Sequence, residues 1–264
     1  MKSQFHEDFY SFAKYYDIAF DFKDVPQECR FLEDVFQKHS KSHLNSFIEF
    51  GAGPALHCLE MAKSLQSVTA VDLSAEMTTY AQDKAAKAGV VVHCECADMI
   101  KYQSENRYDL AVLLMDSTSY LLSNEAVIEH LRSVAQILNP GGLYILEMSH
   151  PKSVFEISKS TASEWEMEKD GIKVKIQWGS PSDTFDPVSQ ITNVSLKMEY
   201  QDGERVGTLK DQSPQRCFTA TEFAALVAAS GVFEIVDWYG AMSTGVPFNN
   251  AEAAWRMVPV LRKS

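Results

Sequence analysis

The sequence has no long apolar run and no stretch dense in Lys and Arg. Its first residues, MKSQFHEDFYSF, contain no apolar core of signal-peptide length, and no later segment approaches a membrane span. Its 24 Lys and Arg stand against 36 Asp and Glu, which gives a formal net charge of −12. Because an acidic surface repels phosphates, the composition argues against a nucleic-acid partner and favours a neutral or cationic small molecule. We therefore expect a cytoplasmic protein that binds neither membranes nor nucleic acid.

Cysteine is scarce as well. Five cysteines, an odd number in 264 residues, do not suggest a disulfide framework. Cys94 and Cys96 have the wrong spacing for a zinc knuckle, and strand alternation places both thiols on one face of a strand. Free cysteine is usually buried, so we predict two core thiols here and no metal site.

What the sequence does contain is a regular alternation of strand and helix patterns. Apolar runs typical of buried strands end near Gly51, Asp72, Asp98, Asp116 and His150, with helical periodicity between them over 54–65, 74–87 and 125–138. This alternation predicts a parallel sheet with right-handed crossovers. Ligands of such sheets bind at the carboxyl ends of the strands, and all five residues fall there.

The pattern changes after residue 151. Polar and apolar residues alternate, and Asp–Gly pairs at 170–171 and 202–203 are typical of antiparallel hairpins. A capping-box pattern at 219–222 and late strands then follow, so we predict that residues about 158–217 are a β-hairpin insertion within a single domain spanning 1–264. The aromatic-rich segment within 1–44 precedes the first strand and is expected to form a helical lid over its end.

A glycine turn follows the first predicted strand, in the stretch FIEFGAGPALH at 47–57. Strand, glycine turn and helix make a nucleotide-type cradle whose backbone N–H groups face a ligand. A dinucleotide fingerprint needs a third glycine close to this turn, but the chain has Ala55 and Leu56 there. Glu49 places an anion near the loop, which disfavours a pyrophosphate and suits a cofactor with sulfonium and ammonium groups. A nicotinamide-dependent oxidoreductase is therefore disfavoured.

The stretch EFGAGPA resembles the first motif of class I S-adenosylmethionine-dependent methyltransferases, and LLMDSTSYL and LNPGGLYILE resemble their later strand segments. The resemblance implies a Rossmann-like α/β fold: a mostly parallel seven-stranded sheet with helices on both faces and an antiparallel β insertion after strand five. It also implies that Asp72 accepts both ribose hydroxyls, that Asp98 binds the adenine amino group and that Met99 lies beside the ring. The predicted cofactor-binding residues are Tyr16, Glu49, Gly51, Ala52, Gly53, Asp72, Leu73, Met77, Ala97, Asp98, Met99 and Met115.

Three side chains are candidates for the catalytic site. The hairpin insertion and the segment QRCFTATEF resemble sugar-amine N-methyltransferases, which have a histidine where this chain has Tyr120. A phenol is a poor base at neutral pH, so Tyr120 either orients the acceptor or is a packing residue. His150 has a pKa range suited to proton removal, or is simply a loop histidine. Asp116 either binds a cationic acceptor or caps the following turn.

The tyrosine pair at 15–16 resembles aromatic residues that cover the methionyl end of the cofactor in this family; helix packing is the alternative. We predict a transferase that moves a methyl group from S-adenosylmethionine to a nitrogen or oxygen of a small molecule. The insertion is expected either to cover the acceptor pocket or to build a homodimer contact. The alternative function is a regulatory protein that binds S-adenosylmethionine without transferring its methyl group.

Overall fold

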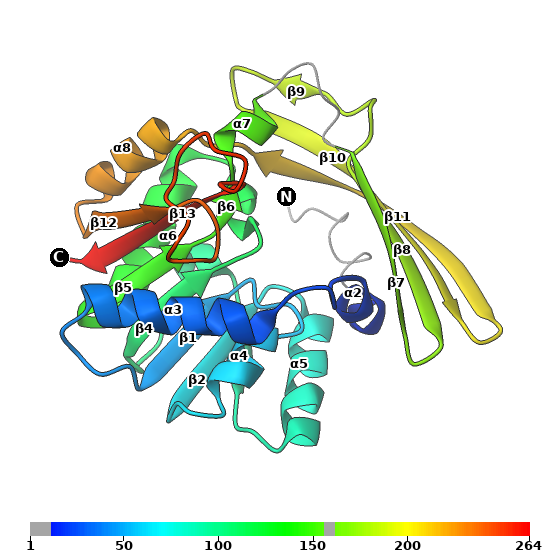
Figure 1. Cartoon of the computed structure of the whole chain (residues 1–264), viewed down its shortest axis with the longest axis horizontal. Helices are drawn as coiled ribbons and strands as arrows, with labels where there is room; N and C mark the ends of the chain where they lie inside the picture. Colours follow the sequence, from blue (N-terminus) through cyan, green and yellow to red (C-terminus); the bar gives the residue numbers. More distant parts are fainter. Residues whose placement is uncertain (1–11, 156–161) are drawn as a thin grey trace.

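The computed structural model describes residues 12–155 and 162–264, which form two β-sheets (Figure 1). The main sheet contains β1 (Ser46–Phe50), β2 (Ser67–Asp72), β3 (His93–Cys96), β4 (Tyr108–Leu113), β5 (Leu138–Leu146), β12 (Phe233–Tyr239) and β13 (Arg256–Lys263). Their order is β12-β13-β5-β4-β1-β2-β3, and only β13 runs against its neighbours. This confirms the predicted Rossmann-like, mostly parallel sheet, to which the two-residue β6 (Met148–Ser149) adds a short pairing with β13.

Helices cover both faces of the main sheet. They are α3 (Val25–His39), α4 (Leu56–Met61), α5 (Ala75–Ala88), α6 (Asn124–Ile137) and α8 (Ala220–Ser230). The structure also contains α2 (Ala13–Ala19), α7 (Pro151–Val154) and the 3₁₀ turns η1 (Met99–Lys101) and η2 (Ser117–Tyr120). In β1, Phe47 packs with the α3–α5 side, including Leu32, whereas its neighbour Ile48 packs with the α6 and α8 side, including Leu131. Because successive side chains of a strand point to opposite faces, β1 contributes to two separate hydrophobic cores. Each such fully buried side chain stabilises the fold by about 2–3 kcal/mol.

The helix boundaries follow from local chemistry. The Ser74 hydroxyl accepts the Met77 N–H at 3.2 Å and caps α5, which ends at Gly89 with φ +69°. At α8, Thr219 and Glu222 form the capping box that the sequence predicts. These caps fix where the helices begin, and therefore where the loops at the sheet edge lie.

The strand order reverses between β1 and β4. From β1 the chain continues outward to β2 and β3, and then crosses back to β4 on the other side of β1. The loops that follow β1 and β4 therefore meet at one edge, which is where open α/β sheets bind ligands.

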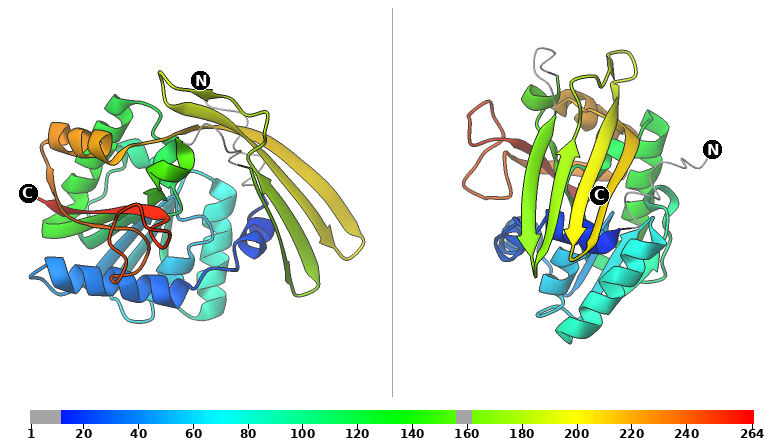
Figure 2. Two further views of the ribbon diagram at one scale, coloured as in Figure 1. Left: turned by 45° about the horizontal axis from the view of Figure 1, so that its top comes forward. Right: turned by 90° about the vertical axis from the view of Figure 1, so that its right-hand side faces the viewer.

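The second sheet contains β7 (Ser163–Lys169), β8 (Ile172–Trp178), β9 (Phe185–Asp186), β10 (Ile191–Asp202) and β11 (Arg205–Arg216). It is antiparallel, as the Asp–Gly pairs predict: Asp170 at φ +52° and Gly171 at φ +74° form the two-residue turn between β7 and β8. Figure 2 shows this sheet standing beside the main sheet, past its carboxyl edge.

Helix α2 joins the two sheets. Ile18 packs with Ile176 of β8, and Asp17 forms an ion pair with Lys84 of α5 at 2.7 Å. The expected lid is thus helical in 13–19 and 25–39, while residues 1–11 lie outside the described part of the chain. Helix α2 consequently lies between the glycine loop and the second sheet.

Three details differ from the sequence prediction. Helix α4 begins at Leu56 and not at Pro54, because Ala55 adopts the left-handed conformation at φ +57°. Strand β4 ends at Leu113, so the turn after it is longer than predicted. The prediction of buried thiols is wrong for Cys96, which is exposed at the end of the edge strand β3, while Cys94 on the same strand is partly buried.

Candidate active site

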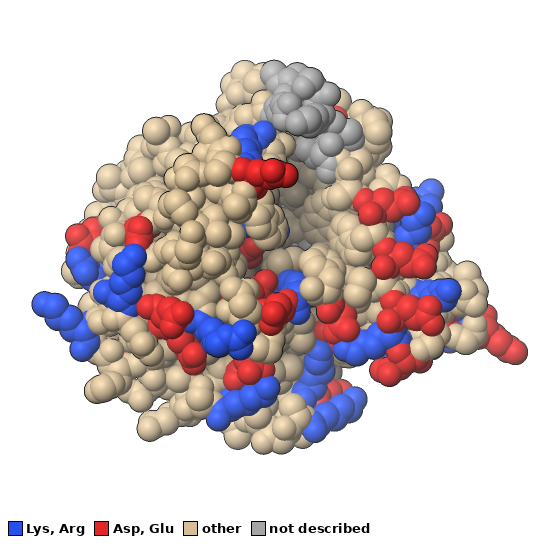
Figure 3. Space-filling model, viewed as in Figure 1, with Lys and Arg blue, Asp and Glu red and all other residues tan. Residues whose placement is uncertain are grey.

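A cavity of about 1040 Å³ opens where the loops after β1 and β4 meet. Its walls come from the glycine loop, η2, the end of β5, α2 and the second sheet. Figure 3 shows a hollow between the main body and the second sheet, with charged side chains gathered at its rim. The volume is at the upper end of the range for ligand pockets, so the cavity has room for more than one small molecule.

The predicted site residues divide into three groups. Those that line the cavity are Tyr16, Glu49, Gly51, Ala52, Gly53, Met115, Asp116 and Tyr120. Those that lie beside it, where β2 and β3 end, are Asp72, Leu73, Ala97, Asp98 and Met99. The remaining two, Met77 and His150, are buried outside the cavity wall.

Three left-handed residues shape the glycine loop. Gly51 has φ +57° and Gly53 has φ +51°, values that favour glycine, and Ala55 has φ +57°. A Cβ at Gly51 would approach the Ser117 hydroxyl oxygen at 3.1 Å. The loop after β1 is therefore in close contact with η2 after β4, and only glycine fits this position without displacing its neighbour.

Asp72, at the end of β2, forms a hydrogen bond to the glycine loop. Its Oδ2 accepts the Gly53 N–H at 2.7 Å, and its Oδ1 accepts the Ser74 N–H at 2.9 Å. Burial raises the pKa of Asp72 above its usual value, although these backbone N–H groups oppose the shift. A carboxylate has about four acceptor positions, and the N–H groups of Gly53, Ser74 and Leu73 act on Asp72, so it keeps acceptor capacity for a ligand hydroxyl.

The surface beside Asp72 is open. Leu73 is 72% exposed, unusual for a large apolar side chain, and Asp98 is exposed with its Oδ1 accepting the Ile100 N–H at 2.8 Å. The Ala97 N–H donates to the Asp72 carbonyl oxygen at 2.9 Å, which keeps the ends of β2 and β3 together. An exposed apolar side chain between two acids is suited to a flat, polar-edged group such as a purine.

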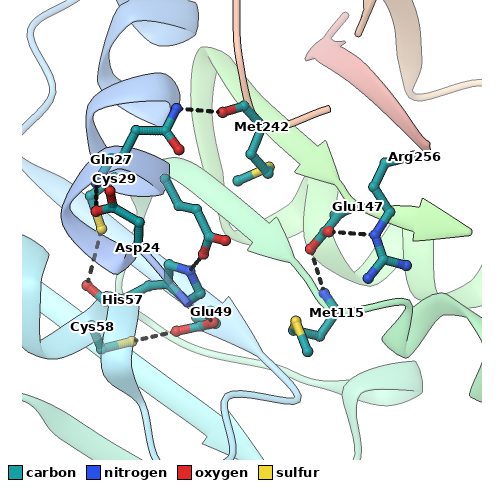
Figure 4. Close-up of polar contacts among 11 residues, drawn as sticks. Asp24, Gln27, Cys29, Glu49, His57, Cys58, Met115, Glu147, Met242 and Arg256 are labelled. Atoms are coloured by element: carbon teal, nitrogen blue, oxygen red, sulfur yellow. Dashed lines mark hydrogen bonds and ion pairs between the residues drawn. The ribbon is translucent and has the colours of Figure 1, made fainter. Parts of the chain in front are cut away.

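Glu49 does not present a free carboxylate to the cavity. Its Oε1 lies 3.0 Å from Nδ1 of His57, and its Oε2 lies 3.3 Å from Sγ of Cys58 (Figure 4). Nε2 of His57 lies 2.7 Å from Oε2 of Glu28 on α3. Sequence reasoning missed His57 and Glu28; the one signal was a histidine eight residues after the motif acid.

Electrostatics in this cluster favour the charged histidine. Burial lowers the pKa of His57, but the charge of Glu49 and the hydrogen bonds that the ring donates to both carboxylates outweigh it, so the net shift is upward. The pKa of Glu28 is lowered, because its hydrogen bond to His57 and the histidine charge outweigh burial.

A second carboxylate cluster lies under the turn after β4. Met115 and Asp116 are both left-handed, with φ +55° and +60°. Glu147, at the end of β5, accepts the Met115 N–H at 2.9 Å and forms an ion pair with Nε of Arg256 at 2.9 Å (Figure 4). Asp116 accepts both the N–H (2.9 Å) and the hydroxyl (2.6 Å) of Ser149. Asp116 therefore holds β6 against this turn and does not cap η2, which corrects that alternative.

The two neighbouring tyrosines point in different directions. A Cβ at Gly53 would lie 3.8 Å from Cε1 of Tyr16, so Tyr16 covers the glycine loop. Burial, with smaller contributions from Tyr120 and Asp72, raises the pKa of Tyr16 well above its usual value. Tyr15 instead stacks on Tyr200 of the second sheet with ring centroids 4.3 Å apart. Of this pair, Tyr16 thus lines the cavity beside the glycine loop, and Tyr15 packs on the second sheet.

The structure does not bring His150 to the cavity. It is 3% exposed, its Nε2 donates to the Asn249 carbonyl oxygen at 3.0 Å, and its Nδ1 accepts the Lys152 N–H at 3.1 Å. Burial lowers the pKa of His150, which keeps the ring neutral with both nitrogens engaged. It therefore acts as a cap for α7 and has no free position for proton removal.

Aromatic residues line the far wall of the cavity. Trp165 and Trp178 come from the second sheet, and the Trp165 indole donates to the Ala19 carbonyl oxygen at 2.7 Å. Phe20 of the lid packs edge-on against Trp165 with ring centroids 5.4 Å apart. Trp238 lies in β12 of the main sheet and is not among the residues that line the cavity.

Comparison with known proteins agrees with this architecture. Residues 47–142 match the family model described as a methyltransferase domain. YqeM of Bacillus subtilis, provisionally named a methyltransferase, is 22% identical over 222 residues, covering 83% of this chain and 84% of the relative. These matches confirm the predicted resemblance to methyltransferases.

Two solved structures extend the likeness to more than nine tenths of the chain. An S-adenosylmethionine-dependent methyltransferase from Clostridium acetobutylicum has a TM-score of 0.80 at 17% identity, covering 96% of this chain and 98% of the other. The sugar N-methyltransferase KedS8 from Streptoalloteichus has a TM-score of 0.70 at 18% identity, covering 91% and 88%. At such low identity the agreement concerns the fold. Within residues 12–155 and 162–264, no helix is both long and apolar enough to span a membrane.

Proposed function

We propose that this protein is an S-adenosylmethionine-dependent methyltransferase that methylates a nitrogen of a small molecule. The observation that carries the proposal is the convergence of the left-handed glycine loop, the Asp72 carboxylate and the ring of Tyr16 at the edge where the sheet reverses its order. The methyltransferase-domain match over residues 47–142 supports the same reaction class.

The residues present fit this cofactor. Gly51 and Gly53 line the cavity with left-handed backbone that carries no side chain, Asp72 keeps acceptor capacity for a ribose hydroxyl, and Asp98 and the exposed Leu73 suit an adenine. When bound, S-adenosylmethionine supplies a methyl group on a positively charged sulfur. Buried Glu49 and partly buried Glu28, with a single histidine between them, leave negative charge on this side of the cavity for a cationic ligand.

The protein's own part in the transfer is to hold the acceptor in line and to exclude water. Tyr16 covers the glycine loop, and Tyr120 lines the cavity at the end of η2, in a position to orient an acceptor. Such positioning is the main contribution available to a displacement on an already activated carbon. We assign the second sheet the role of covering the acceptor side, since Trp165, Trp178 and Val194 belong to the cavity wall.

The nearby carboxylates already have hydrogen-bond partners, and this favours nitrogen over oxygen as the acceptor atom. A hydroxyl loses its proton as it attacks and needs a base beside it, whereas a neutral amine already has a free lone pair. Glu147 is engaged by Met115 and Arg256, and Asp116 is engaged by Ser149. The fold likeness to a sugar N-methyltransferase supports the same choice.

A binding protein without transferase activity is the alternative function. Side chains that plug the space beside the methyl group would favour it, but the cavity extends from the glycine loop to the second sheet. The deciding experiment incubates the protein with isotopically labelled S-adenosylmethionine and pools of small amines and alcohols. Mass spectrometry of a labelled amine would support the proposal. Cofactor binding without labelled product in any pool would favour the binding protein.

A further inference from the structure

His57 bridges two carboxylates that come from different parts of the chain. Nδ1 lies 3.0 Å from Glu49 of β1, and Nε2 lies 2.7 Å from Glu28 of α3. The histidine is 2% exposed and Glu49 is 4% exposed. An ionised carboxylate only accepts hydrogen bonds, so the ring can satisfy both partners only when both of its nitrogens carry hydrogen. The bridging form is the imidazolium.

The bridge connects the lid to the cofactor loop. Glu28 lies in the first turn of α3, and Glu49 lies two residues before Gly51. Upstream of α3, α2 holds Tyr16 over Gly53. A contact that fixes the start of α3 therefore also restrains the position of Tyr16 over the glycine loop.

We propose that His57 is a positioning residue: in its doubly hydrogen-bonded form it docks the start of α3 onto the glycine loop, so that cofactor binding depends on one proton. This inference rests on the proposed function. His57 belongs to the cavity wall with Glu28 and Glu49, but it is 2% exposed and both of its ring nitrogens face these two carboxylates (Figure 4), so we assign it to positioning and not to the methyl transfer itself.

Other charged and titratable groups act on the bridge. Lys23 opposes the charge on His57, Arg256 lowers the pKa of Glu28, Cys58 contacts Glu49, and Cys29 lies 3.9 Å from the His57 carbonyl oxygen. Burial raises the pKa of both thiols, so they stay protonated and neutral at working pH. The two carboxylates therefore decide the state of the histidine.

The raised pKa of His57 determines the direction in which cofactor binding changes with pH. The docked form is complete below the ordinary histidine pKa of about 6.5 and is lost as the pH rises through the folded-state value. A neutral imidazole has a single N–H, so one of the two carboxylates then faces a nitrogen lone pair and loses its hydrogen bond. The start of α3 is then no longer held to the glycine loop. Cofactor binding should weaken toward alkaline pH.

The test measures the Kd of S-adenosylhomocysteine by calorimetry from about pH 6 to about pH 9, a range that spans the titration of a raised histidine. We expect the Kd of wild type to rise toward pH 9 by about fivefold or more, the lower end of typical coupling between two linked equilibria. His57→Gln should give a higher Kd and remove this step, leaving only the titration of the ligand's own amine. Glu28→Gln keeps an acceptor oxygen but loses the charge, so it should move the midpoint to lower pH. Exposed His93→Gln is the matched control and should change nothing.

The outcomes separate the two proposals. An identical pH profile in wild type, His57→Gln and Glu28→Gln would overturn the positioning role while leaving cofactor binding intact. Absence of binding at every pH would overturn both. If His57→Gln does not fold, Glu28→Gln decides alone: an unshifted midpoint contradicts the inference.

Discussion

The carboxylate of Asp72 accepts the backbone N–H of Gly53 at 2.7 Å, which ties the end of β2 to the glycine loop after β1. The two groups are brought together by the parallel pairing of β1 with β2. This contact places the predicted ribose acceptor directly beside the predicted cradle, and the first prediction depends on it.

Asp72→Ala should weaken the binding of S-adenosylhomocysteine by about 1.5–3 kcal/mol, the range for hydrogen bonds to a charged group. Calorimetry at neutral pH measures the change. Asp83→Ala on the exposed face of α5 is the matched control and should bind like wild type. Unchanged affinity in Asp72→Ala would remove Asp72 from the cofactor site.

Gly51→Ala should damage both the fold and the site. Gly51 and Gly89 are both left-handed, so an added Cβ costs about 1–2 kcal/mol at either position. At Gly89 the Cβ would meet nothing within 4 Å, whereas at Gly51 it would meet Ser117 at 3.1 Å. Denaturant unfolding should therefore show a larger loss for Gly51→Ala by about 1–3 kcal/mol, with lost cofactor binding for this variant alone. Equal losses would mean that the close contact with η2 does not matter.

Tyr120→Phe should lower turnover without changing cofactor affinity. If the hydroxyl orients the acceptor, its removal costs about one hydrogen bond, or roughly tenfold in kcat. The comparison needs kcat with the identified acceptor and the Kd of S-adenosylhomocysteine on the same preparation. Wild-type turnover in Tyr120→Phe would leave Tyr120 as a packing residue.

His130 should make the protein less stable in mild acid. It is fully buried, its Nδ1–H donates to the Met99 carbonyl oxygen at 2.7 Å, and its Nε2 accepts the Tyr144 hydroxyl at 2.6 Å. Burial lowers the pKa of His130 to about 4, so only the unfolded chain takes up a proton between about 6.5 and that value. This contribution to stability is present above that window and is lost as the pH falls through it.

Denaturant unfolding at several pH values checks the effect of His130. The free energy of unfolding should fall by up to about 1.4 kcal/mol per pH unit within the window, and His130→Gln should flatten that slope. The exposed control His93→Gln should keep it. A slope that survives in His130→Gln would assign the acid sensitivity to other groups.

Much of the fold follows from local patterns in the sequence. The strand that ends at Asp72 and the helix expected over 74–87 stand where the sequence pattern predicts them, and a serine cap and a left-handed glycine mark the two ends of that helix. Such features depend on residues within a few positions of each other, which is the information that a single sequence contains. The hairpin turn at 170–171 likewise follows from two adjacent residues.

The site features that could not be predicted from the sequence depend on tertiary contacts. The Glu28–His57 contact joins residues 29 positions apart, and no local pattern relates them. Which of two adjacent tyrosines covers the glycine loop depends on how α2 is rotated against the second sheet. His150 follows a strand end like the true edge residues, but its ring turns to Asn249, almost a hundred residues later. The left-handed backbone of Ala55 carries no signal in its residue type.

Thermal unfolding with added ligands tests the central claim most directly. The protein is melted alone, with S-adenosylmethionine, with S-adenosylhomocysteine and with NAD⁺, in wild type and Asp72→Ala. A ligand at about a hundred times its Kd stabilises the folded state by about 2.7 kcal/mol, so the two sulfur ligands should raise the Tm of wild type by several degrees and NAD⁺ should not. A wild-type Tm that neither S-adenosylmethionine nor S-adenosylhomocysteine raises would contradict the account.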